Sequence, residues 1–319
     1  MSKNFNAKKA VKLVGNAFVI AALAFVVKKI ADMDIKMSDL SSPKVVAAFV
    51  FSMVIQAALI VIACFPWLMF TRSLSGVRIP YKAAMPVYTK SNIYKYLPGN
   101  VFQYVGRNKL AADMNISHVD VACATILDIL FCVFWTGVVS VILLGSRIAE
   151  LLEKYGRNIL LVGICGVLFL AAVIIVIRVK FADKFRSYIS RYAKAFEKEN
   201  RPQLFSGIFY YFVHNCVSAG MYLICVMLIV PDASFREQLV LTGAFMFAWI
   251  IGFVTPGAPG GIGIREGVMI FVSGDKYSDR IILFALVMRF SSILADVTAF
   301  VIGNIFGKRF ECRRAGQQS

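Results

Sequence analysis

Long apolar runs recur along the chain and constrain its fold more than any other feature. Apolar residues make up 59% of the sequence, and a helix of about 20 apolar residues is enough to cross a bilayer. Because backbone polar groups in lipid must be hydrogen-bonded within their own segment, runs of this kind cross as helices. The runs cover residues 13–27, 45–70, 121–144, 159–177, 205–230, 239–254, 262–272 and 281–306, of which 262–272 is short and broken. The sequence therefore predicts an all-α integral membrane protein of about eight transmembrane spans, with residues 1–319 as a single polytopic membrane domain.

The distribution of positive charge predicts how these spans are oriented. Eight spans place both termini on one side of the membrane. With that side cytoplasmic, the cytoplasmic segments hold 22 lysines and arginines and the opposite segments hold 10, in agreement with the positive-inside rule. The cytoplasmic segments are then 1–10, 71–118, 178–204 and 307–319, and the opposite segments are 28–44, 145–157, 231–237 and 274–280. We therefore expect a multi-pass protein of the cytoplasmic (inner) membrane, with both termini in the cytoplasm and a basic cytoplasmic tail at 307–319.

The formal net charge of +17 does not require a nucleic-acid partner. Basic residues beside membrane spans are attracted to anionic lipid head groups, and the sequence has no soluble basic module that would bind nucleic acid. Residues 180–200 place aromatic residues at helical spacing between basic ones, which is typical of a helix lying in the membrane interface. Residues 178–204 are therefore interpreted as a basic amphipathic cytoplasmic linker.

Two segments combine helix-breaking residues with an arginine. Residues 255–267 (TPGAPGGIGIREG) contain five glycines and two prolines between apolar runs, and residues 80–109 contain Pro98-Gly99 in an aromatic stretch too short to span. Non-helical backbone at membrane depth is tolerated only where it is buried in protein or lines a cavity. Interrupted segments at corresponding places in two halves point to a transport site. We therefore expect two broken or re-entrant elements that approach one another. Their placement in the two halves is compatible with an inverted pseudo-repeat, although the sequence shows no letter-by-letter repeat.

Charged residues near these breaks are the candidates for a site. An arginine suits a phosphodiester because its planar fork donates two hydrogen bonds, and a charge within the bilayer is costly unless it is paired or hydrated. A structural interpretation stays open, in which Arg265 lies in a packing turn and Asp296 neutralises Arg265 or Arg289. The candidates for binding a charged ligand are Arg107, Gly260, Gly261, Gly263, Arg265, Glu266 and Arg289, with Asp128, Asp296, Pro98 and Gly99 in supporting or coupling roles.

The segment 259–267 (PGGIGIREG), together with the upstream residues 96–100 (YLPGN) and Gly106-Arg107, resembles the transmembrane region of lysylphosphatidylglycerol synthases and its stand-alone relatives. The similarity spans nearly the whole chain and includes the number of spans and the order of the two motifs. In the fused members this region flips aminoacylated phospholipid, which a separate soluble domain makes. These residues hold no such domain. The resemblance thus implies flippase-like transport of a phospholipid or lipid-linked saccharide, supplied by a separate synthase or glycosyltransferase, and does not imply lysyl transfer.

Two other functions stay open at this level. One alternative is a membrane glycosyltransferase that uses a polyprenyl donor. It is prompted by the acidic residues of Asp32-Met33-Asp34, because carboxylates there would act as a base or as metal ligands. Broken helices would serve an ion-coupled transporter of a soluble solute equally well. The sequence has no GxxxxGK[ST] P-loop and no Cys/His cluster. We therefore expect transport without ATP hydrolysis, and no catalytic residue, metal or cofactor.

The predicted orientation is testable at the C-terminus. In sealed cells carrying Ser319→Cys, a membrane-impermeant thiol reagent should label this cysteine only after the membrane is permeabilised, because the tail is cytoplasmic. The native cysteines are replaced beforehand to remove background labelling. Labelling of intact cells would reverse the predicted topology.

Overall fold

The computed structural model describes residues 41–96, 102–111, 114, 116–145, 147–157, 178, 182–255 and 264–315. Over these residues the structure is helical with short turns and contains no strand, which confirms the all-α prediction. Five stretches in this part of the chain are long and apolar enough to cross a membrane: Pro43–Ser75, His118–Leu144, Arg201–Ile229, Phe235–Val254 and Asp275–Phe306. The expected spans at 13–27 and 159–177 lie outside the described residues.

The apolar run at 45–70, expected as one span, consists of two helices. Helix α3 (Pro43–Ile62) begins after Ser42, whose side chain accepts a hydrogen bond from the backbone of Val45. Ala63 separates α3 from α4 (Cys64–Ser75), which ends at Gly76 with a φ of 74°. A left-handed residue at a helix end favours glycine because glycine carries no Cβ. Hydropathy does not reveal the break, since both helices are apolar.

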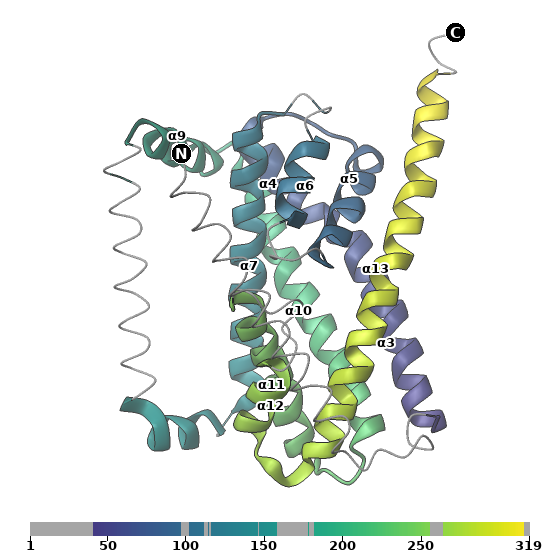
Figure 1. Cartoon of the computed structure of the whole chain (residues 1–319). Helices are drawn as coiled ribbons and strands as arrows, with labels where there is room; N and C mark the ends of the chain where they lie inside the picture. The colour runs from purple at the N-terminus through teal and green to yellow at the C-terminus, as the bar shows by residue number, and fades with distance from the viewer. Residues whose placement is uncertain are drawn as a thin grey trace, which may run out of the picture.

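Two helical hairpins lie at opposite ends of the bundle (Figure 1). At one end α5 (Tyr81–Ile93) leads into the short 3-10 turn η1 (Tyr94–Tyr96), and α6 (Phe102–Ala111) packs back against α5. At the other end α11 (Phe235–Val254) packs against α12 (Ile264–Ser273).

Helix α12 begins in the interior of the bundle and does not cross the membrane in full. It has ten residues, which rise about 15 Å, roughly half of the hydrocarbon core. Its end lies beside the start of α11, because Glu237 accepts hydrogen bonds from Lys276 (2.6 Å) and Tyr277 (3.2 Å), both in the 3-10 turn η4 (Asp275–Tyr277) that follows α12. The hairpin of α11 and α12 therefore begins and ends at the same end of the bundle.

Long helices connect the two ends of the bundle. Helices α7 (His118–Leu144), α10 (Arg201–Ile229) and α13 (Ser278–Ala315) extend beyond the apolar runs from which they were predicted. Polar caps explain part of the difference: Ser117 caps α7, and Ser234 forms a capping box with Glu237 at the start of α11. Such caps satisfy backbone N–H groups that a helix start leaves unpaired. Helix α13 continues through most of the predicted basic tail.

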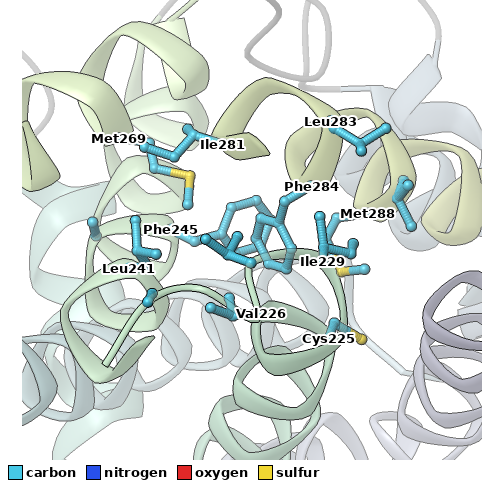
Figure 2. Close-up of a cluster of buried hydrophobic side chains, with 14 of the residues drawn as sticks. Cys225, Val226, Ile229, Leu241, Phe245, Met269, Ile281, Leu283, Phe284 and Met288 are labelled. Atoms are coloured by element: carbon cyan, nitrogen blue, oxygen red, sulfur yellow. The ribbon is translucent and has the colours of Figure 1, made fainter. Parts of the chain in front are cut away.

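Two apolar cores occupy the two ends. Figure 2 shows the first, where Phe284 of α13 is fully buried and its ring lies 5.0 Å from that of Phe245 in an edge-on arrangement. This core joins α3, α10, α11, α12 and α13. The second core surrounds the fully buried Trp67 and Phe70 of α4 and joins α4, α5, α7 and α10. Burying aromatic side chains in this way fixes the helices on either side of the middle of the bundle.

The segment predicted as an amphipathic linker contains α9 (Ala182–Ala195), which packs against α4 and α7. Arg191 of α9 forms an ion pair with Asp120 in the first turn of α7, and the Tyr192 hydroxyl donates to the Cys123 carbonyl at 3.4 Å. These contacts attach α9 to the end of the bundle that carries α5 and α6.

The contact between α7 and α11 predicts where the bundle tolerates no added volume. A Cβ at Gly243 would lie 3.0 Å from the backbone N of Leu144 and the backbone O of Ser140, which are backbone atoms and cannot turn aside. Gly243→Val should therefore destabilise the folded protein by about 1–3 kcal/mol, measured as a lower thermal unfolding midpoint. Gly220→Val is the matched control, because Gly220 is also inside a long helix but has open space around it. Equal midpoints for the two variants would contradict this packing.

Candidate functional site

A cavity of about 650 Å³ lies between the two apolar cores. Both hairpins reach it: η1 and α6 contribute side chains from one end of the bundle, and the last turns of α11 and the first turn of α12 contribute from the other. Helices α3, α7, α10 and α13 complete the wall. Its charged side chains, among the described residues, are Lys95, Arg107, Asp128, Arg265, Glu266, Arg289 and Asp296.

The structure brings together the charged residues nominated from the sequence, since all six of them line this one cavity. Lys95 also lines this cavity. It was not among the candidates from the sequence, although it lies in the aromatic stretch that contains Pro98-Gly99. The signal that would have found it is its position three residues before Pro98 of the Pro98-Gly99 break. The remaining nominated residues, Pro98, Gly99, Gly260, Gly261 and Gly263, lie outside the described residues.

Arg107 of α6 is held on several sides. Its Nη1 lies 3.0 Å from Asp128 Oδ2 of α7, and its Nε donates to Ser91 Oγ at 3.3 Å. Its guanidinium lies over the Tyr88 ring, 3.9 Å from the centroid, a cation–π arrangement. The Tyr211 hydroxyl donates to the other oxygen of Asp128. With a side chain only 3% exposed, Arg107 ties α6 to α5 and α7 and presents little surface to a ligand.

Arg289 of α13 binds Glu266 of α12 through two nitrogens. Nε donates to Oε1 at 2.9 Å and Nη2 donates to Oε2 at 3.3 Å. Two parallel bonds of this kind are strong and orient both planar groups. The pair fixes the first turn of α12 against α13. Arg265, the neighbour of Glu266, is half-buried and lines the same cavity.

Asp296 of α13 forms its salt bridge with Lys95 of η1, at 2.6 Å, and accepts a hydrogen bond from the Asn92 side chain of α5, also at 2.6 Å. The sequence interpretation had Asp296 neutralise Arg265 or Arg289, and the structure gives Asp296 an ion-pair partner that was not predicted, Lys95. The reason is geometric: η1 brings Lys95 to the cavity wall, and Glu266 already occupies two nitrogens of Arg289. A sequence does not place η1 beside α13.

Uncharged polar groups and aromatic rings occupy the rest of the wall. Thr136 of α7 donates to Asn215 of α10 at 2.7 Å, a hydrogen bond that links the two helices. The rings of Trp249 and Phe253, near the end of α11, stack with centroids 5.3 Å apart and planes 7° apart. The cavity therefore offers apolar and polar surfaces together, as small-molecule and head-group sites do.

The charges of the wall do not cancel. Four cationic and three acidic side chains line the cavity among the described residues, which leaves one formal positive charge in excess. Because a cavity with low-dielectric walls strengthens the field of its charges, this excess favours an anionic guest. Within the same described residues, no group of His, Cys, Asp and Glu side chains has the arrangement of a metal site. Asp32 and Asp34, on which the glycosyltransferase alternative depends, lie outside them.

Comparison with known proteins yields no match to a family model, to a curated protein or to a solved structure.

The Arg107–Asp128 pair should be required for folding. Asp128→Asn removes the carboxylate and leaves a buried guanidinium without compensation, so we expect a loss of about 3–5 kcal/mol of stability. The measurement is denaturant unfolding of the purified protein in detergent. The double variant Arg107→Gln with Asp128→Asn removes both charges and should recover part of the loss. A single variant as stable as the unmodified protein would show that the pair carries no stability.

Proposed function

We propose that this protein translocates an anionic phospholipid or a lipid-linked saccharide across the cytoplasmic membrane, without ATP hydrolysis. The observation that carries the proposal is the cavity in which two hairpins from opposite ends of a membrane-spanning bundle meet and contribute paired charges. Charged side chains at membrane depth are costly and mark ion or substrate pathways. Interrupted elements that meet at such a depth are typical of transport proteins.

The cavity wall includes side chains on the outer surface of a spanning helix, and this favours cargo that stays partly in lipid. Phe290 and Ile293 of α13 line the cavity and are 60% and 41% exposed. Both lie near the middle of the stretch Asp275–Phe306, so the surface they expose faces the hydrocarbon region. A head group in the cavity would then remain joined to acyl or prenyl chains that pass these side chains into the bilayer.

The proposed binding groups are the cations of the wall. Arg265 and Arg289 face the cavity from α12 and α13, and an arginine binds phosphate oxygens through two donors at once. Glu266 orients Arg289. Arg107 contributes mainly its charge, because its guanidinium is engaged with Asp128 and Tyr88. The same cavity would suit a phosphorylated soluble solute, and the experiment below separates these cargoes.

The proposed topology keeps cytoplasmic termini, with two of the eight apolar runs forming the α11–α12 hairpin in place of two full crossings. This hairpin returns to the end of the bundle at which it begins. Helix α13 therefore starts on the same side of the membrane as it would after two full crossings. We place the end that carries α5, α6 and α9 in the cytoplasm, because the segments predicted there are rich in lysine and arginine. The two hairpins, one from each end, are compatible with an inverted pseudo-repeat. A separate synthase or glycosyltransferase would supply the cargo.

The proposal is tested by lipid translocation in vesicles that contain the purified protein. Fluorescent phosphatidylglycerol, phosphatidylethanolamine and a lipid-linked saccharide are compared through the fraction that an impermeant quencher reaches. We expect faster translocation for at least one head group. Arg265→Gln and Arg289→Gln should lower the rate about tenfold or more, since a charge-assisted hydrogen bond is lost. Lysine at either position should restore only part of the rate, because it lacks the planar fork.

The matched control is Lys276→Gln, which removes a cation from an exposed pair outside the cavity and should leave the rate unchanged. Thermal unfolding of every variant separates a lost binding group from a lost fold. Translocation of no head group, together with uptake of a phosphorylated soluble solute, would replace this function with solute transport.

A further inference from the structure

Lys95 differs from the other paired cations of the cavity in how much of it a guest is able to reach. Its side chain is 32% exposed, compared with 18% for Arg289 and 3% for Arg107. A ligand is able to reach a charge that is already partly open to the cavity without displacing the side chains that cover a buried one. Lys95 is therefore the paired cation that an incoming anion meets with the smallest rearrangement.

The Lys95–Asp296 pair also differs from the two arginine pairs in the chemistry of its cation. Its ammonium meets one oxygen of Asp296, whereas Arg289 binds both oxygens of Glu266. Arg107 is held in addition by Ser91 and by the Tyr88 ring. A lysine ammonium is a compact charge on a flexible stem and is able to turn toward a new partner, whereas a forked arginine pair has a fixed geometry.

Asp296 keeps a hydrogen-bond donor if Lys95 turns away. Its side chain is fully buried, and a buried carboxylate that loses its partners is strongly destabilising. The Asn92 side chain, which donates to Asp296 at 2.6 Å, stays in place because Asn92 belongs to α5. When Lys95 moves to another anion, Asp296 therefore keeps its hydrogen bond from Asn92.

The packing of α5 against α13 does not depend on this ion pair. Gly303 of α13 lies so close to Thr89 of α5 that a Cβ at position 303 has no room. Ala84 and Met85 of α5 are buried in the core around Trp67. Close packing thus holds α5 on both sides. The Lys95–Asp296 pair is therefore able to exchange partners without loss of this packing.

We propose that Lys95 is an anion-binding residue of the cavity, and that Asp296 holds its ammonium in place until the phosphate of the cargo takes it over. This inference rests on the proposed function and names an exchangeable ion pair within its site. The bond between Lys95 and Asp296 breaks and a bond between Lys95 and the phosphate forms. Binding thereby releases Lys95 of η1 from α13, while α5 stays attached to α13 through Asn92 and its packing contacts.

The test is a set of four proteins that differ only at this pair: the unmodified chain, Lys95→Gln, Asp296→Asn and the double variant. Dissociation constants are measured for two probes, dihexanoyl phosphatidic acid and inorganic phosphate, with the purified full-length protein. Asp296→Asn should bind dihexanoyl phosphatidic acid on the order of tenfold more tightly, because the competing carboxylate is gone. Lys95→Gln should bind it more weakly, and adding Asp296→Asn to Lys95→Gln should change nothing further.

Glu237→Gln is the matched control, since Glu237 and Lys276 form a second Lys–carboxylate pair at the same 2.6 Å separation, outside the cavity. Its dissociation constants should equal those of the unmodified chain. An unchanged or weakened affinity in folded Asp296→Asn would overturn the competition between carboxylate and phosphate. If Asp296→Asn does not fold, Lys95→Gln decides alone, and an unchanged affinity in that variant overturns the proposal.

The probes also separate this inference from the proposed function. Tighter binding of the short-chain lipid than of inorganic phosphate, with the expected pattern across the variants, supports a lipid as the source of the phosphate. Equal binding of both probes with the same pattern supports the ion-pair exchange at Lys95, while contradicting a lipid cargo. Active lipid translocation with no effect of either substitution overturns the role of Lys95 and leaves the transport function standing.

Discussion

Charged side chains in the middle of this bundle are stable because they are paired. Among the described residues, α13 supplies one partner in two of three ion pairs at the cavity. Arg289 holds the first turn of α12, and Asp296 holds η1 and the end of α5. An unpaired charge at such a depth would cost several kcal/mol. The positions of both hairpins therefore depend on a single helix that runs the length of the bundle. The third pair, between Arg107 and Asp128, fixes α6 to α7 instead.

The three pairs differ in rigidity, and the difference follows from the chemistry of their cations. Arg107 and Arg289 use planar guanidinium groups that engage several partners, which suits a permanent attachment between helices. Lys95 binds one oxygen of Asp296 through an ammonium on a flexible stem. The first turn of α12 is therefore attached to α13 by a two-bond arginine pair. The α5–α6 hairpin has one arginine pair, in α6, and one lysine pair, in η1, and only the lysine pair is simple to exchange. An exchange of partners is thus confined to η1 and leaves the first turn of α12 attached to α13.

Hydropathy was sufficient to predict the long helices, and the sequence was insufficient for what depends on three-dimensional contact. Helices α7, α10, α11 and α13 contain or closely overlap the apolar runs expected for them, with ends moved outward by caps such as Ser117 and Ser234. The break at Ala63 was not predicted because the residues on both sides of it are apolar. The nominated charges do line one cavity. This was predictable because broken backbone and charged side chains are both costly in lipid, and a polar cavity within the protein accommodates both. The identity of each partner was not predictable: Lys95 and Asp296 are about two hundred positions apart in the sequence, and only the packing of α5 against α13 brings them together.

A ligand that binds in this cavity must not leave any of the paired charges of the wall without a partner. An anion that binds one of the paired cations replaces a carboxylate, and that carboxylate then needs another donor in a place from which water is largely excluded. Asp296 has such a donor in Asn92, which makes its ion pair the one that exchanges at the lowest cost. The excess of one cation over the acidic groups accommodates the added negative charge. Selection of cargo at this site would then depend less on the number of arginines than on whether the guest leaves each buried carboxylate with a hydrogen-bond partner.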